Sequence, residues 1–391
     1  MLLGKIRARV QDNLRGQPNY TCTQTVERSR RAARSNKFTL IDTLRLEVAL
    51  VNGREMHSWP GAEKFEERDL VEWAGGGTIG NGDFALFARA VFLSGAGSMI
   101  YAGREMASGR ETHKLSFDVP IFSSGYNIRV SQQRGIVGYR GAAWVDADNL
   151  DLRRLEFETT DIPPNLPILK GRDLIEYERQ RIGEEDYLLP KSSEMALIGF
   201  DGTESRNRTS FSNCRQYGVT SSLRFDDPGP SAPPPVELVD WTLPEEIGIQ
   251  VKLLAPLDSK KAAVGDSVPV EVARDAKRKG VVLVPKGARA RLRVTRLDVI
   301  PRPTEYLLLG LALDGLSFEN KRVKNRFSLD APKNIGFQPH SSSDPMRSRG
   351  PAAPVFSLEG GVVENIIQIR GAQAQFKAGW QTDWSSQAPP R

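Results

Sequence analysis

The stretch GYRGAAWVDADNLDLRRLEF at residues 138–157 predicts a β-hairpin. A turn rich in Asp and Asn, at residues 146–151, suits tight-turn geometry. After the turn, Leu155 and Phe157 alternate with charged residues, as expected for a strand with one apolar and one solvated face. The hairpin therefore predicts a broad antiparallel sheet that buries one face.

The same alternation recurs through the first half of the chain. Residues 20–26 and 38–50 are expected to be strands, and Asn52-Gly53 is expected to turn the chain into a third strand. Apolar residues at helical spacing in residues 3–14 predict an amphipathic helix that lies on the sheet. Two shorter helical segments are expected at residues 65–73 and 83–92. The predicted fold class is mainly β.

Length and composition limit the class of protein. The chain has 391 residues, of which 39% are hydrophobic and 26% charged, so it is long enough for two domains with separate cores. No apolar run approaches the roughly 20 residues that span a bilayer as a helix. The net charge of +6 favours contact with anionic polymers or lipid headgroups, and peripheral membrane contact is therefore allowed. Charge alone does not choose between these partners.

A proline-rich segment divides the chain. Residues 226–244 contain six prolines, among them Pro233-Pro234-Pro235, and are expected to form a stiff linker outside any sheet. We therefore expect an N-terminal domain at residues 1–225 and a β domain at residues 245–384. Residues 334–354, rich in Pro and Ser, are expected to be a mobile insertion in the second domain.

Candidates for catalysis or metal binding are few. His57, His113 and His340 lie far apart in sequence, and none belongs to a ligand or nucleophile motif. His57 and His113 fall on expected strands, where we interpret them as surface or rim residues. The acidic residues listed next fall in expected turns, where we interpret them as solvated: Asp146, Asp148, Asp151, Glu184, Glu185 and Asp186. We expect no enzyme activity, no metal and no cofactor.

Nucleic acid is not an expected partner. Basic clusters occur at residues 28–34 and 277–279. Single-stranded nucleic acid is bound by aromatic side chains interleaved with basic ones, and these clusters contain none.

The two cysteines fall in the first and last expected strands of the N-terminal domain. A disulfide between Cys22 and Cys214 would close a very long loop and implies an oxidising compartment. The alternative is two unpaired buried thiols. We favour the disulfide, because both cysteines lie in terminal strands of one domain.

The N-terminus does not resemble a secretory signal. Lys5, Arg7 and Arg9 interrupt the apolar run that such a signal needs. We expect either a cytoplasmic protein or a chain whose leader is missing from this sequence.

Residues 1–225 resemble the periplasmic lipoprotein-carrier superfamily of Lol type, which includes envelope-stress regulators of the same fold. The resemblance is carried by the N-terminal helix, the run of antiparallel strands, the helices between Phe65 and Phe92, and Trp144-Val145-Asp146 leading to Leu155-Glu156-Phe157. It implies an unclosed antiparallel β-barrel with a helical lid over an apolar cavity for acyl chains, in the periplasm or cell envelope.

Two further resemblances concern the rest of the chain. Residues 245–384 resemble the small β-barrel module of outer-membrane proteins in conjugation and type IV secretion, through Val264-Gly265-Asp266 and residues 281–287. Only a small β-barrel is implied, and no channel. The whole chain also resembles uncharacterised two-domain proteins of acidobacteria, through residues 18–25 and 211–214. That resemblance implies no activity.

Two functions follow as hypotheses. In the first, the N-terminal cavity binds the acyl chain of a lipid or lipoprotein, as a carrier or sensor. Its expected apolar contacts are Leu40, Leu44, Leu46, Val48, Phe117 and Trp144, with Asp42 near the rim. In the second, the chain is an envelope scaffold that contacts other envelope proteins. An open cavity would favour the carrier, and one filled by Trp73, Phe84, Phe87 and Trp144 would favour the scaffold.

Overall fold

The computed structural model describes the chain except for Met1 and several internal and C-terminal stretches. The described residues are 2–62, 64–68, 70–73, 78–80, 84–107, 109–130, 133–217, 238–300, 306–330 and 365–388. The chain divides into two compact units, Met1–Ser222 and Leu223–Arg391. Each unit is described by itself.

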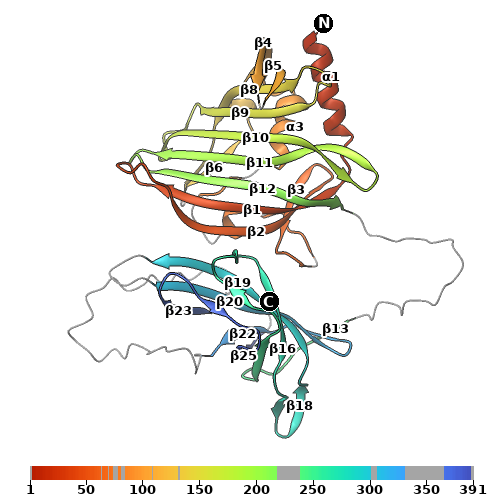
Figure 1. Ribbon diagram of the computed structural model, residues 1–391, viewed down its shortest axis with the longest axis vertical. Coiled ribbons are helices and arrows are strands. Elements are labelled where there is room, and N and C mark those ends of the chain that lie inside the picture. The colour runs from red at the N-terminus through yellow and green to blue at the C-terminus, as the bar shows by residue number, and fades with distance from the viewer. Residues whose placement is uncertain are drawn as a thin grey trace, which may run out of the picture. The chain divides into compact units, whose positions relative to one another are not determined.

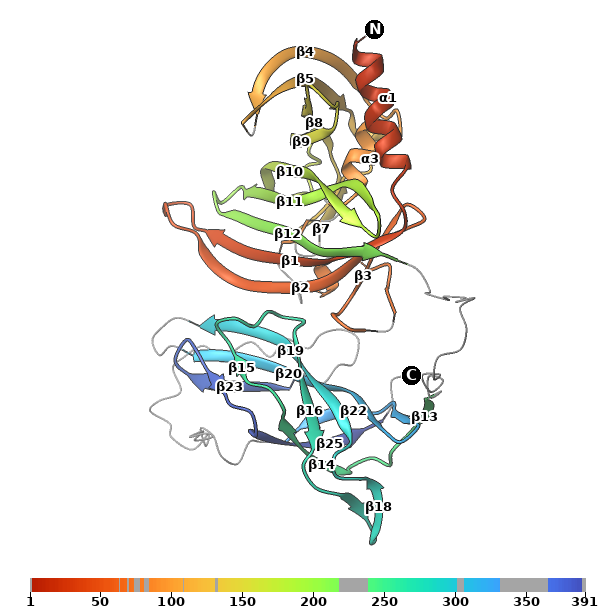
Figure 2. The same ribbon diagram turned by 45° about the vertical axis from the view of Figure 1, so that its right-hand side comes forward.

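The first unit is built on one curved antiparallel sheet of ten strands (Figure 1). The strands pair in the order β3-β2-β1-β12-β11-β10-β9-β8-β5-β4, so the path runs from β3 to β4 without closing. Figure 2 shows the sheet curling while its two ends stay apart. The strands are β1 (Tyr20–Arg31), β2 (Thr39–Val51), β3 (Arg54–Ser58), β4 (Ser98–Ala107), β5 (Arg110–Val119), β8 (Gly138–Asp146), β9 (Leu152–Thr160), β10 (Ile168–Ile182), β11 (Glu185–Gly199) and β12 (Glu204–Gln216).

Alternation along the strands explains how this sheet folds. On the predicted hairpin of β8 and β9, Ala143 and Val145 are buried, as are Leu155 and Phe157 on the partner strand. Successive side chains of a strand point to opposite faces, so the buried ones share the inner face of the curve. At the β2–β3 turn, Asn52 and Gly53 both have positive φ, as a two-residue hairpin turn requires.

Three helices and a short hairpin cover the inner face. They are α1 (Leu2–Arg15), α2 (Leu70–Trp73), α3 (Leu86–Phe92) and the pair β6 (Asn127–Val130) and β7 (Gln133–Ile136), and a 3-10 turn, η1 (Ile121–Ser123), follows β5. Ile6, Val10 and Leu14 form the apolar stripe of α1, and all three are buried in the same core as the sheet residues. The helical lid is therefore packed onto the sheet.

The second unit is also a β structure. Within the described residues, its main sheet follows the path β13-β21-β20-β19-β16-β14-β25-β22, with β23 also paired to β20. Two small pairs, β15–β24 and β17–β18, complete it. The bounds are β13 (Val239–Trp241), β14 (Gly248–Leu253), β15 (Leu257–Asp258), β16 (Ser267–Val272), β17 (Ala276–Arg278), β18 (Val281–Val284), β19 (Arg289–Ile300), β20 (Tyr306–Phe318), β21 (Lys321–Val323), β22 (Arg326–Leu329), β23 (Ile366–Arg370), β24 (Gln375–Phe376) and β25 (Gln381–Gln387).

The predicted fold class, a mainly β chain whose N-terminal part is an unclosed antiparallel sheet under helices, is confirmed. One detail of the linker is wrong. The end of residues 226–244 does join a sheet, because β13 pairs in parallel with β21. Residues 226–237 and the predicted insertion at 334–354 lie outside the described residues. The resemblance of the second unit to secretion proteins stays a prediction.

Candidate functional site

Four of the six predicted acyl-chain contacts are buried. Leu44, Leu46 and Val48 of β2 are at most 1% exposed, and Phe117 of β5 is buried as well. Phe117 belongs to the core that α1 and α3 share with the sheet, and Val48 belongs to a second apolar cluster around the disulfide. The structure thus places these four side chains on the inner face, and their role in ligand binding stays a proposal.

Leu40 was expected on that face, and this placement is wrong. Arg28 pairs with Asp42 and the next residue of β1, Ser29, pairs with Leu40, so Ile41 is an extra residue in β2. A bulge of this kind reverses the alternation beyond it. The side chain of Leu40 is 58% exposed as a result.

Trp144 was also expected on the inner face, and this placement is wrong for a different reason. Its neighbours on β8, Ala143 and Val145, point inward, so Trp144 points outward. On the outer face, Lys114 and Arg154 lie over its ring at 5.1 and 5.3 Å from the ring centre. These contacts are cation–π interactions on the solvated side of the sheet.

Aromatic side chains fill the space between α3 and the sheet. The ring of Phe87 lies 5.0 Å from Tyr126, 4.7 Å from Phe157 and 6.1 Å from Tyr139. Edge-to-face and tilted ring contacts at these distances stabilise a core beyond the area that they bury. This part of the inner face is therefore occupied by the protein's own side chains.

The second cluster lies around the disulfide, which is confirmed. Cys22 on β1 and Cys214 on β12 are bonded, with Cα atoms 4.1 Å apart. The two cysteines meet because the first and last strands of the unit pair with each other. Phe84 packs beside them, with ring centres 4.9 Å from Tyr20 and 5.1 Å from Phe211.

Three of the four side chains expected to fill a cavity are buried. Trp73, Phe84 and Phe87 are 6%, 1% and 6% exposed, whereas Trp144 lies on the outer face. An acyl chain can therefore reach the inner face only if the covering elements move away from it.

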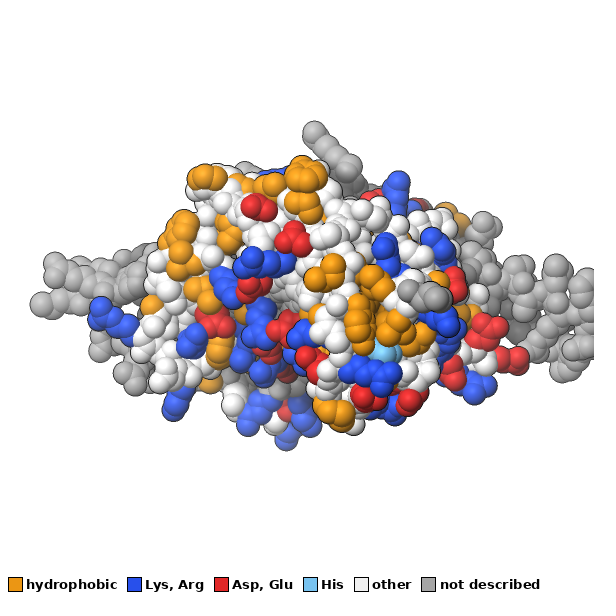
Figure 3. All heavy atoms as spheres, turned by 90° about the horizontal axis from the view of Figure 1, so that it is seen from above, with side chains coloured by type: hydrophobic (Ala, Val, Ile, Leu, Met, Phe, Trp, Pro, Cys, Tyr) orange, Lys and Arg blue, Asp and Glu red, His pale blue; other side chains and the backbone are white. Residues whose placement is uncertain are grey.

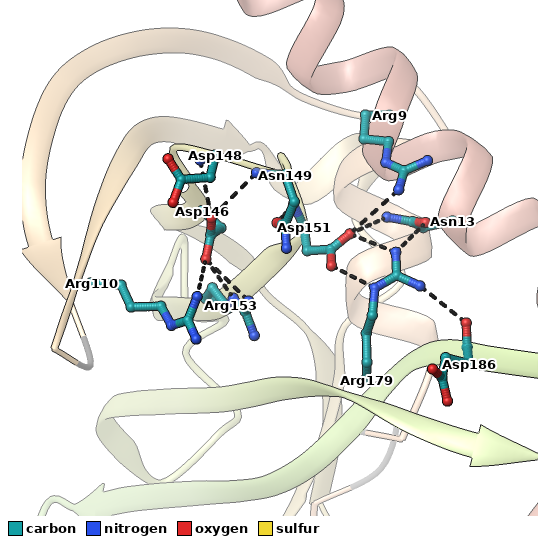
Figure 4. Close-up of polar contacts among 10 residues, drawn as sticks. All are labelled: Arg9, Asn13, Arg110, Asp146, Asp148, Asn149, Asp151, Arg153, Arg179 and Asp186. Atoms are coloured by element: carbon teal, nitrogen blue, oxygen red, sulfur yellow. Dashed lines mark hydrogen bonds and ion pairs between the residues drawn. The ribbon is translucent and has the colours of Figure 1, made fainter.

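A set of polar contacts attaches α1 to the sheet (Figure 4). The carboxylate of Asp151, at the start of β9, is completely buried. It accepts hydrogen bonds from Asn13 Nδ2 at 3.0 Å and from Nε and Nη2 of Arg179 at 2.7 and 2.9 Å. Arg9 Nη2 lies 4.0 Å from the same carboxylate. We call Arg9, Asn13, Asp151 and Arg179 the α1 latch.

The α1 latch shifts the pKa of Arg179. The hydrogen bond from the guanidinium to the Asp151 carboxylate raises the pKa of Arg179. Burial opposes this effect, and the carboxylate outweighs it. The latch therefore joins Asp151, Arg179 and the Asn13 side chain of α1 through hydrogen bonds.

The other contacts of the cover join the helices to one another and to β3. Gln11 Nε2 donates to the carbonyl of Phe92 at 2.7 Å, and Arg89 Nη2 donates to the carbonyl of Leu14 at 2.8 Å. At the start of α3, the backbone N–H of Ala85 donates to Glu55 Oε1 at 2.7 Å. These bonds are made by side chains, so α1 and α3 are not part of the sheet's backbone ladder. The segment before α2 is joined to β3 by backbone hydrogen bonds between His57 and Glu66.

Asp146 forms the neighbouring polar centre. It accepts hydrogen bonds from the N–H groups of Asp148 and Asn149 at 3.0 and 3.3 Å, and Arg153 Nη2 lies 3.0 Å away. Burial would raise the pKa of Asp146, but these donors outweigh it and hold the pKa below its ordinary value. The interpretation of the acidic residues as solvated is wrong for Asp146 and Asp151, which are both buried.

A buried ion pair crosses the inner face near one end of the sheet. Arg28 Nε donates to Asp42 Oδ1 at 2.7 Å, and the two residues are 7% and 9% exposed. Asp42 was expected near the rim, and its pairing with Arg28 explains how it is buried instead. On β10, Asp173 accepts a hydrogen bond from the hydroxyl of Tyr126 at 2.7 Å. The inner face therefore contains buried polar groups with hydrogen-bond partners as well as apolar side chains.

The histidines expected at the surface are buried. His57 is 4% exposed, and neither ring nitrogen has a hydrogen-bond partner. Burial lowers the pKa of His57 to about 4, so the ring is neutral at neutral pH. His113 is also buried, with Nδ1 at 3.2 Å from the hydroxyl of Tyr101. Among the described residues, no group of His, Cys, Asp and Glu side chains is arranged to hold a metal ion.

The outer face carries a groove of about 590 Å³ beside Trp144. Ala142 and Ile100 contribute apolar surface, and the charges around it are paired. Arg140 lies 3.4 Å from Glu158, and Arg172 is bonded to Glu156. The groove is lined mainly by residues that alternate with the buried ones, and the buried Phe117 and Phe157 also border it.

Comparisons with solved structures find several matches at low sequence identity. A LolA superfamily protein from Nitrosomonas europaea matches at 12% identity and a TM-score of 0.30, over 55% of this chain and 94% of that chain. A DUF1329 family protein from Desulfovibrio piger matches at 14% identity and a TM-score of 0.27, over 57% of this chain and 95% of that chain. The MucA/MucB complex of Pseudomonas aeruginosa matches at 12% identity and a TM-score of 0.18, over 82% of this chain and 90% of that chain.

Other comparisons add nothing to these likenesses. No protein-family model matches the chain, and no curated protein matches it. At such identities and TM-scores, the likenesses transfer no ligand or partner to this chain. Within the described residues, no helix has the length and apolar character needed to cross a membrane.

Proposed function

We propose that the first unit is a non-catalytic binding module that takes the acyl chain of a lipid or lipoprotein onto its inner face. One observation carries the proposal. Leu44, Leu46, Val48 and Phe117 are buried apolar side chains of the sheet, and Phe117 shares its core with α1 and α3, which are not strands of the sheet. Because side chains attach α1 and α3, these two helices can move away while the backbone ladder of the sheet stays intact.

An acyl chain can replace the apolar contacts that the cover makes with the inner face. Opening the cover exposes the apolar stripe of α1 and the aromatic side chains of α3. An acyl chain that takes their place restores burial at about 0.8 kcal/mol for each methylene group removed from water. Such a chain needs no specific polar contact with the protein.

The disulfide supports a place in the cell envelope. Disulfides persist in oxidising compartments such as the periplasm, and they are rare in the cytosol. Cys22 and Cys214 are bonded in this fold. We therefore propose the periplasm or cell envelope as the site of action.

A second candidate function rests on how fully the inner face is filled. Trp73, Phe84 and Phe87 are buried, as a scaffold without a small ligand would require. In that case both units would contact only other envelope proteins. The scaffold takes up no acyl chain, so one binding measurement separates the two functions.

The experiment uses two neighbours on opposite faces of β2. The full chain is titrated with a fluorescent fatty-acyl probe, and the Leu44→Gln and Arg45→Ala variants are compared with the parent protein. Leu44→Gln should abolish uptake of the probe, whereas Arg45→Ala should leave it nearly unchanged. Urea unfolding confirms that each variant is folded.

Two results would overturn the proposal. One is a parent protein that takes up no probe, which leaves the scaffold. The other is a folded Arg45→Ala variant that loses binding as fully as the Leu44→Gln variant does.

A further inference from the structure

We propose that one rim of the first unit docks onto an anionic lipid bilayer. This proposal goes beyond acyl-chain binding, because it concerns exposed loops and not the inner face. Figure 1 shows the β1–β2 hairpin at one end of the sheet and the β10–β11 hairpin at the other. We call the end with the β1–β2 hairpin the docking rim.

Contacts between loops show that distant parts of the sequence meet at this rim. Gly202, in the β11–β12 turn, lies so close to Ala33 in the β1–β2 hairpin that a side chain would not fit between them. The N–H of Phe200 donates to the carbonyl of Pro167, which precedes β10. Gly138, at the start of β8, lies against Asp161 and the backbone of Ile121. The loops therefore form one continuous edge.

Large apolar side chains project from these loops. Their exposed fractions are 58% for Leu40, 46% for Ile41, 88% for Phe122, 57% for Leu169 and 62% for Phe200. They come from four separate places along the rim: Leu40 and Ile41 at the start of β2, Phe122 in η1, Leu169 at the start of β10 and Phe200 in the β11–β12 turn. Apolar side chains at separate loop tips can enter a headgroup layer together, as the apolar face of an interfacial helix does.

Basic side chains flank them. Between Ser29 and Leu40 the chain has four basic residues, Arg30, Arg31, Arg34 and Lys37, and no acidic residue. Arg31 is bonded to Glu204, whereas Arg34 and Lys37 are exposed. Lys and Arg side chains at this depth are attracted to the phosphates of anionic lipids. This charge complementarity favours a bilayer over a protein partner.

The docking rim differs from the opposite end of the sheet in its acidic residues. The acidic groups of the rim are engaged locally, since Asp201 accepts a hydrogen bond from Thr203 and Glu204 is bonded to Arg31. The opposite end contains the acidic run Glu184-Glu185-Asp186. Its most exposed large apolar side chain among the described residues is Met106, at 68%. The opposite end thus has a run of three acidic residues, whereas the β1–β2 hairpin of the rim has no acidic residue between Ser29 and Leu40.

The test is sedimentation of the full chain with two kinds of vesicle. One kind is phosphatidylcholine alone, and the other is an equimolar mixture of phosphatidylcholine and phosphatidylglycerol. The protein should bind the anionic vesicles, and added salt should weaken that binding. The Arg34→Gln/Lys37→Gln variant should bind them roughly 20- to 30-fold less well, because each basic residue near such a surface contributes a few-fold. The Phe122→Ser/Phe200→Ser variant should also lose binding.

Matched variants at the opposite end are the controls. Arg110→Gln/Arg181→Gln removes the same charge there, and Met106→Ser removes an exposed apolar side chain. Both should bind as the parent protein does. The proposal is overturned if the parent protein binds neither kind of vesicle, which would leave a protein partner for the rim, or if the control variants lose binding as fully as the rim variants.

The same proteins keep this proposal separate from acyl-chain binding. The rim variants should take up the fatty-acyl probe as the parent protein does, and the Leu44→Gln variant should still bind anionic vesicles. If the folded Leu44→Gln variant loses vesicle binding, that binding belongs to the inner face. This result would overturn the proposal that the docking rim binds the bilayer.

Discussion

Asn13 of α1 donates a hydrogen bond from Nδ2 to Oδ1 of Asp151 at 3.0 Å, across 138 residues of sequence. The acceptor carboxylate is completely buried and is also held by Arg179. A helix that covers the inner face is thus attached to the sheet through a charged group. Weakening that group should loosen the cover before it affects the sheet.

The Asp151→Asn variant tests this attachment. The substitution removes the charge that Arg179 and Asn13 share, so the first unit should lose about 1–3 kcal/mol of stability. Amide hydrogen exchange in α1 should become roughly tenfold faster or more, because its local opening becomes easier. Exchange in β10 and β11 should change much less.

Asp148→Asn is the matched control. Asp148 lies in the same loop and is exposed, and its backbone N–H, not its side chain, bonds to Asp146. Its exchange pattern should equal that of the parent protein. Equal protection of α1 in the parent protein and in Asp151→Asn would show that the latch does not hold the helix.

His57 should make the first unit less stable in mild acid. Its pKa is about 4 in the folded chain, against 6.5 for an ordinary histidine. Between pH 6.5 and 4 the unfolded chain therefore binds more protons than the folded one, and stability falls as the pH falls through that window. The full effect is about 3 kcal/mol. Urea unfolding at several pH values should show a correspondingly shallower slope for His57→Leu, and an unchanged slope would contradict the buried neutral ring.

Cys22 and Cys214 should stabilise only the first unit. The bonded residues are 192 positions apart, and for a loop of this length chain entropy predicts a contribution of about 5 kcal/mol. The Cys22→Ala/Cys214→Ala variant should lower the unfolding transition of the first unit and leave that of the second unit in place. Two reactive thiols per chain in denatured, unreduced material from an oxidising compartment would show that the bond does not form.

The two compact units should unfold separately. Cleavage within residues 226–237 should release two fragments, each with its own cooperative transition. Among the described residues, each buried apolar cluster lies entirely within one unit, which supports separate unfolding. A fragment that is molten on its own would show that the units share a core.

The alternation of apolar and polar residues was enough to predict the hairpins. It failed where an extra residue in one strand reverses the alternation. Val145 and Leu155 follow the pattern of their strands, so the β8–β9 hairpin could be predicted. The extra residue Ile41 has no sequence signature, and it turned Leu40 outward. Trp144 was grouped with the inward residues, although its position between the inward Ala143 and Val145 indicates the outer face.

The contacts that attach the cover could not be predicted in the same way. Asp151 lies in a turn sequence that usually faces solvent, and only the packing of α1 beside the turn buries it. The ion pair of Arg28 and Asp42 likewise depends on strand register. Such groups become visible when segments far apart in sequence are brought together.

Quenching of tryptophan fluorescence by a brominated fatty acid tests acyl-chain binding at the inner face most directly. Trp59, which follows β3, and Trp73 of α2 lie beside each other with ring centres 5.0 Å apart, whereas Trp144 lies on the outer face. The parent protein, a Trp59→Phe/Trp73→Phe variant and a Trp144→Phe variant are compared. The remaining tryptophans, all in the second unit, give a constant background: Trp241, Trp380 and Trp384.

The account predicts that the brominated chain quenches the parent protein and the Trp144→Phe variant alike, and that the quenching is largely lost in the Trp59→Phe/Trp73→Phe variant. Loss of quenching in Trp144→Phe alone would place the ligand in the outer groove and contradict the account. No quenching of the parent protein would contradict acyl-chain binding at the inner face altogether.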